Sequence, residues 1–67
     1  MMNPDVAREI AKAALEPLDL FNGKLGDDAI RHLVDGTEAC LCIEKYRVHI
    51  RRNGLIEIDL INPKQPC

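Results

Sequence analysis

The sequence predicts an α+β domain in which two helices pack on one face of a three-stranded antiparallel β-meander, in the order α-α-β-β-β. Apolar residues recur with the helical period of 3.6 in the first half of the chain and with the strand period of 2 from Thr37 onward. Turn signals such as Asn53-Gly54 separate the periodic segments. A chain of 67 residues can bury only one core, so residues 1–67 are predicted to be a single small domain.

The first helix is predicted over residues 4–16. Asn3 is a good N-cap, and Pro4 suits the first helical position. Apolar residues share one broad arc of the helical wheel and charged residues occupy the other, so the helix is amphipathic. Four alanines on the apolar arc allow another element to approach closely. Pro17 cannot continue a helix, so the end is predicted at Glu16.

A second, shorter helix is predicted over residues 27–35. Asp27 is expected to cap it, and Gly36 is expected to end it in a left-handed conformation. The preceding residues 17–26 are predicted to be a connector that packs its apolar side chains under the domain. The buried stripe of the helix consists of Ile30, Leu33 and Val34.

Three strands are predicted over residues 38–43, 46–51 and 55–61. Apolar residues are at odd positions up to Ile43 and at even positions from Tyr46. A two-residue turn at Glu44-Lys45 would explain this change, because it places the apolar residues of both strands on one face. Glu-Lys is poor chemistry for such a turn, and a bulge within one long strand would also absorb the change. Residues 38–51 are therefore either two strands or one bulged strand.

The second turn sets the register of the last strand. A two-residue Asn53-Gly54 loop would place Ile50 opposite Glu57, an apolar residue facing an acid. A three-residue loop over residues 52–54 pairs apolar with apolar residues and gives Gly54 the left-handed position that such a loop requires. The predicted pairs are Ile50–Ile56, Val48–Ile58, Tyr46–Leu60, His49–Glu57 and Arg47–Asp59. The tail, residues 62–67, is predicted to be extended or frayed.

Composition excludes several classes of function. The chain has no serine, which excludes a serine nucleophile, and it has no glycine-rich phosphate loop or paired-carboxylate motif. A domain of this size is expected to have no room for a deep cleft of several hundred Å³, the usual size of a small-molecule site (about 300–1,000 Å³). We therefore predict a protein that is not an enzyme and has no cofactor.

The expected location is the cytoplasm, without membrane attachment. The longest apolar run, Ala39–Ile43, is far shorter than the ~20 residues of a membrane span. Asp5, Arg8 and Glu9 occupy positions where a secretory signal would be apolar. The cysteine count of three is odd, which argues against a disulfide framework and favours a reducing compartment.

The sheet face that no helix covers is the most informative surface. Basic side chains concentrate on its middle strand, as a strand that follows a phosphate backbone would require. Acids at Glu38, Glu57 and Asp59 are predicted to lie across from them and to neutralise their field. The candidate binding residues on this side are Lys45, Arg47, His49, Arg51 and Arg52.

Charge is unevenly distributed along the chain. Residues 1–36 carry seven acids and four Lys or Arg, a net charge of −3, whereas residues 37–67 carry four and five, a net charge of +1. An acidic helical surface could dock on the basic surface of a nucleic-acid-handling protein. Asp28 and Asp35 are the candidate residues on that surface.

A metal site is the least favoured of the candidates. Cys40 and Cys42 point to the same side of one strand, and the predicted register places His49 across from Cys40, which offers two sulfurs and one imidazole. A fourth ligand is missing, and the C-x-C spacing is not the usual one. No metal is therefore predicted, with Cys40, Cys42 and His49 kept as weak candidates.

The predicted function is that of a small non-catalytic protein-binding regulator or inhibitor. Accessory proteins of phages and mobile elements are of this size and block host or defence machines that handle nucleic acid by stoichiometric docking. The predicted partner is a protein, and a homodimer through an edge strand is compatible with this prediction. The alternative is a small nucleic-acid-binding regulator that uses the basic strand over residues 45–52.

Overall fold

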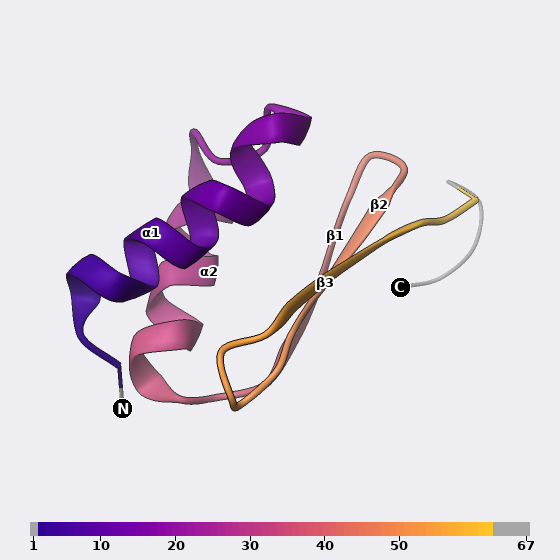
Figure 1. The fold of residues 1–67 in the computed structure, drawn as a ribbon. Helices are drawn as coiled ribbons and strands as arrows, with labels where there is room; N and C mark the ends of the chain where they lie inside the picture. Colours follow the sequence, from indigo (N-terminus) through magenta and orange to yellow (C-terminus); the bar gives the residue numbers. More distant parts are fainter. Residues whose placement is uncertain (1, 63–67) are drawn as a thin grey trace.

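The computed structural model describes residues 2–62 and confirms the predicted α+β class and the helix-helix-strand order (Figure 1). The three strands form one antiparallel sheet in the order β1-β2-β3. The elements are α1 (Pro4–Leu15), a 3-10 turn η1 (Glu16–Leu18), α2 (Lys24–Asp35), β1 (Ala39–Ile43), β2 (Tyr46–Ile50) and β3 (Ile56–Leu60). The predicted tail, apart from residue 62, lies outside the described residues.

Helix α1 begins as predicted and ends one residue early. The Asn3 side chain accepts a hydrogen bond from the backbone N–H of Asp5 at 2.8 Å, and Pro4 occupies the first turn. The helix ends at Leu15, because Pro17 is accommodated in the tighter η1 turn. Ala7 and Ala11 are fully buried, as the alanine-rich arc predicts.

The predicted start of the second helix at Asp27 is wrong. Helix α2 begins at Lys24, with Gly23 as an N-cap that provides no side-chain bond. The N–H of Asp27 instead donates to the carbonyl of Gly23 at 3.3 Å, so Asp27 lies inside the first turn. An acid is favourable both as the N-cap and within the first turn, because both positions lie at the positive end of the helix dipole. The sequence alone therefore did not show which of the two positions Asp27 occupies. Gly36 ends the helix in the left-handed conformation, as predicted.

Both predicted turns and the whole predicted register are confirmed. Ile43 pairs with Tyr46 across the Glu44-Lys45 turn, so residues 39–50 form two strands and not one bulged strand. Ile50 pairs with Ile56 across the three-residue loop, in which Gly54 has φ +88°. Glu44 has φ +53°, and this left-handed conformation explains how an unfavourable sequence closes the first hairpin.

Replacing Glu44 by asparagine is expected to stabilise the protein by about 0.5 kcal/mol, because asparagine adopts the left-handed conformation more readily. Glu44→Val should destabilise it by about 1 kcal/mol, since a β-branched side chain is strained at positive φ. Urea unfolding of both variants measures whether the unfolding free energy rises for the first and falls for the second. A change in the same direction for both would contradict the left-handed conformation of Glu44.

The core lies where the helices meet one end of the sheet. Helix α2 contacts α1 as well as β1 and β2, and in Figure 1 the hairpin end of the strands extends away from the helices. Val48 and Ile50 are completely buried, whereas Ile43 is 36% exposed and Leu60 is 72% exposed. The inward face of the sheet is therefore covered at one end and accessible at the other.

Candidate functional site

The predicted basic face of the sheet is neutralised by its own acids. Arg47 lies 3.4 Å from Asp59, its partner on β3. His49 Nε2 lies 3.3 Å from a Glu38 carboxylate oxygen, and its Nδ1 lies 3.9 Å from Glu57. The Arg47–Asp59 and His49–Glu57 pairs were predicted from the register, and a cross-strand ion pair such as Arg47–Asp59 contributes about 0.2–1 kcal/mol.

Arg51 is the most closely paired of these cations. Its Nε donates a hydrogen bond to the Glu57 carboxylate. That hydrogen bond, and then the charge of Glu57, raise the pKa of Arg51 above its ordinary value. The outer face of the sheet thus presents alternating paired charges and lacks the continuous positive strip that binds a phosphate backbone.

The remaining candidate residues do not join this face in one site. Lys45 is in the hairpin turn, with its amine 5.6 Å from the centre of the Tyr46 ring. Arg52 is at the opposite end of β2, in the loop before β3. Asp28 and Asp35 lie on α2, where Asp28 is 3.6 Å from Arg31 and Asp35 is exposed. The predicted site residues therefore belong to separate surfaces.

The weak metal candidates are also not assembled into a site. Cys40 has an exposed thiol, whereas Cys42 is disulfide-bonded. The expectation from the odd cysteine count that no disulfide forms is therefore wrong for Cys42. Over residues 2–62, no group of three or more histidine, cysteine, aspartate or glutamate side chains is placed to hold a metal ion.

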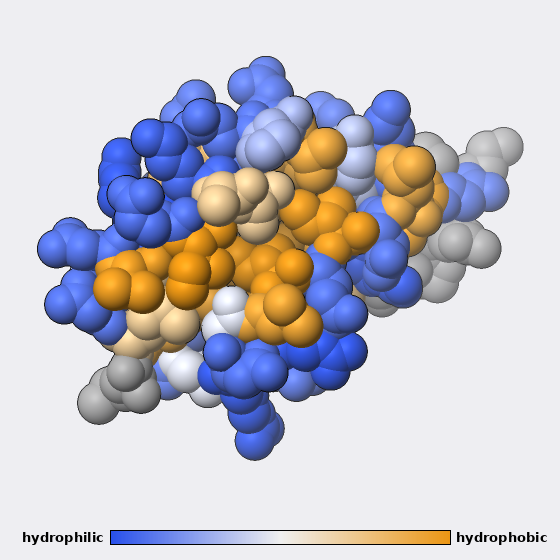
Figure 2. Space-filling view, viewed as in Figure 1, coloured by the Kyte–Doolittle hydropathy of each residue, from blue (hydrophilic) through white to orange (hydrophobic). Residues whose placement is uncertain are grey.

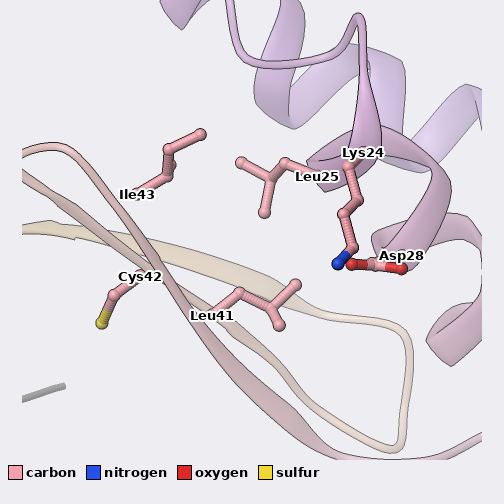
Figure 3. A pocket seen from close by; sticks show the side chains of 6 residues that line it. All are labelled: Lys24, Leu25, Asp28, Leu41, Cys42 and Ile43. Carbon is pink, nitrogen blue, oxygen red and sulfur yellow. The ribbon is translucent and has the colours of Figure 1, made fainter.

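The accessible end of the inward sheet face contains two hollows, one on each side. The hollow at β1 has a volume of about 240 Å³. Figure 3 shows Leu25 of α2 facing Leu41 and Ile43 of β1 across it, with Lys24 and Asp28 at its rim. Cys42 points away from the gap (Figure 3). This hollow has an apolar floor and one charge of each sign at its edge.

The hollow at β3 is larger than the hollow at β1, and its lining is more apolar. It has a volume of about 330 Å³ and is lined by residues of η1, β2 and β3. Leu18 forms the side nearest the helices, and Tyr46 and Leu60, which are cross-strand partners, lie on the sheet side. Figure 2 shows an apolar band that continues from the helical part of the molecule across to the sheet. The lining residues are Leu18, Tyr46, Ile58, Asp59 and Leu60.

Sequence reasoning missed this surface. It placed Ile56, Ile58 and Leu60 alike on the face that the helices cover, because all three have the same place in the alternation. The only signal was the small number of helical residues available to cover three strands. The volume of about 330 Å³ is at the lower end of the range of ligand sites, but the hollow is an open surface depression and not a deep cleft.

The fold and these surfaces define a small α+β domain with an incompletely covered sheet. No family model, curated protein or solved structure matches the chain. Within the part of the chain that the structure describes, neither helix is long and apolar enough to cross a membrane.

Proposed function

We propose that this protein is a non-catalytic protein-binding regulator that docks through the apolar hollow at β3. The observation that carries the proposal is the exposure of Leu60, 72% of whose surface is accessible beside a hollow of about 330 Å³. A large aliphatic side chain gains about 1.5–3 kcal/mol when it is fully buried. An accessible apolar patch of this kind is typical of a surface that a partner covers.

The internal pairing of the outer face supports a protein partner over a nucleic acid. Arg47, His49 and Arg51 already have acidic partners. The carboxylates cancel the positive field of the two arginines that would attract a phosphate backbone, and the chain as a whole carries a charge of −2.

The acidic helical surface supports a more specific proposal, that the regulator inhibits a machine that handles nucleic acid. The carboxylates of Asp27 and Asp35 have no ion-pair partner among the described residues and are exposed on α2. They would approach a basic surface without first breaking a salt bridge, and would accelerate association by electrostatic attraction.

Leu60→Asp is expected to abolish binding of a stoichiometric protein partner. The tagged protein and this variant are used for affinity capture from host lysate, with and without nuclease, and the bound proteins are identified by mass spectrometry. Burial of an aspartate in the hollow would leave an unpaired charge in the interface, so we expect at least about a tenfold loss of the partner.

Leu55→Asp provides the matched control, because Leu55 is 51% exposed but lies at the other end of β3, outside the hollow. It should capture the same partner as the original chain. If Leu60→Asp captures as much of the partner as the original chain does, the proposal is overturned. Bound proteins that are lost after nuclease treatment would favour the nucleic-acid alternative.

A further inference from the structure

At the outer edge of β3, the backbone N–H and C=O groups of alternate residues form no hydrogen bond to β2. Arg51 N–H donates to the carbonyl of Leu55 at 2.8 Å, and Ile61 N–H donates to the carbonyl of Lys45 at 2.8 Å. In an antiparallel ladder, only every second residue of a strand forms backbone hydrogen bonds to the neighbouring strand. Between Leu55 and Ile61, the residues of β3 that bond to β2 are therefore Glu57 and Asp59. The N–H and C=O groups of the alternate residues, Ile56, Ile58 and Leu60, therefore point away from the sheet.

This edge runs directly along the hollow at β3. Ile58 and Leu60 contribute their side chains to the hollow, and their backbone groups point to the side where no strand is paired among residues 2–62. Edge strands commonly carry a protecting proline or an inward-pointing charge. Neither occurs within β3, whose inward residues are all aliphatic.

Resting on the proposed function, we propose that β3 binds its partner by strand addition, and that the partner contributes an extended segment in which apolar and basic residues alternate. The apolar residues of this segment lie over Ile58 and Leu60 and fill the hollow. Its basic residues lie on the outer face, opposite Glu57 and Asp59, where opposite charges stabilise a strand pair. Each of these carboxylates contacts the cations of β2 through one oxygen, Oε1 of Glu57 and Oδ2 of Asp59, so the other oxygen can accept from a cation on the far side of β3.

The same acids disfavour a second copy of this chain as the occupant. Antiparallel self-pairing over the whole of β3 is centred on Ile58 and places Glu57 of one copy opposite Asp59 of the other, twice. Centring it on Ile56 or on Leu60 avoids this contact but pairs only one end of the strand. Centring it on Glu57 or on Asp59 places identical acids opposite each other. Like charges directly opposite destabilise a strand pair, whereas lysines at these positions in a partner stabilise it.

The test uses two labelled peptides and the intact protein. One peptide, Thr-Val-Lys-Ile-Lys-Val-Thr, has the proposed pattern, and the other has glutamate in place of both lysines. Fluorescence anisotropy at low salt should show that the lysine peptide binds at least about tenfold more tightly, because two attractive pairs replace two repulsive ones.

Two proline variants separate strand addition from simple apolar contact. Leu60→Pro removes one outward-pointing N–H of β3 without removing a bond to β2. It should weaken peptide binding about tenfold more than Leu60→Ala, which shortens the same side chain but keeps the N–H. Cys40→Pro makes the equivalent change on β1, since Ala39 and Leu41 on either side of Cys40 are the residues that bond to β2. This control should bind the peptide within about twofold of the original chain.

Amide hydrogen exchange gives a second readout that needs no variant. On adding the lysine peptide, the amides of Ile56, Ile58 and Leu60 should become protected, while that of Cys40 should not. No binding of the lysine peptide, equal binding of the glutamate peptide, or protection confined to β1 would overturn strand addition.

Lysate capture distinguishes failure of this inference from failure of the proposed function. A partner lost with Leu60→Asp but retained with Leu60→Pro would confirm docking at the hollow and overturn strand addition. A partner retained with both variants would overturn the proposed function as well. Self-association of the chain that Leu60→Pro abolishes would identify a second copy as the occupant and overturn the proposed partner.

Discussion

Gly26→Ala is expected to destabilise the protein strongly, although alanine in a helix normally stabilises by about 1 kcal/mol relative to glycine. Gly26 is buried in the first turn of α2. A Cβ atom there would lie 1.8 Å from the carbonyl oxygen of Phe21 and 2.9 Å from its carbonyl carbon. These are backbone atoms, so the overlap cannot be relieved by a change of rotamer.

The connector or the start of α2 would have to move, and both hold core residues. Leu20 and Leu25, on either side of the contact, are only 7% and 9% exposed. We expect a loss of at least ~3 kcal/mol. A chain of 67 residues typically has an unfolding free energy of about 3–10 kcal/mol, so the folded population would fall sharply.

Urea denaturation followed by circular dichroism measures this effect. Asp27→Ala is the matched control, since Asp27 is the next residue, is exposed and loses only its dipole interaction, worth about 0.3–1 kcal/mol. A Gly26→Ala variant as stable as the original chain would show that α2 and the connector do not approach each other as described.

Ile50→Ala is expected to destabilise the protein by about 2–5 kcal/mol, the range for removing a buried aliphatic side chain. Ile50 is completely buried and is among the largest side chains in the core. It also pairs with Ala39 on one side and Ile56 on the other, so the cavity would lie on the middle strand, at the end of the sheet that the helices cover.

Leu60→Ala should change stability by less than about 0.5 kcal/mol, because Leu60 is mostly exposed. Ile50 and Leu60 face the same side of the sheet. The difference between the two losses of unfolding free energy therefore reports how well the helices cover each position. Thermal and urea unfolding of the two variants provide the measurement, and similar losses for both would mean that the accessible end of the sheet is covered in solution.

Local patterns in the chain account for the pairing of the strands. Placing Ile50 opposite Glu57 would have been unfavourable, and this single consideration selected the three-residue loop that is observed. The pairing then placed Arg47 beside Asp59 and so anticipated that the outer face would be neutralised. The start of α2 was not anticipated, because Gly23 gives no side-chain capping signal.

The accessible surface at β3 depends on how far the helices extend over the sheet. Alternation identifies which side chains share a face, because successive residues of a strand point to opposite sides. It does not distinguish Ile50 from Leu60, since both occupy inward positions. Helix α2 contacts β1 and β2, and the core buries Ile50 but leaves Leu60 accessible. That difference arises from packing between distant segments, which no local pattern of residues contains.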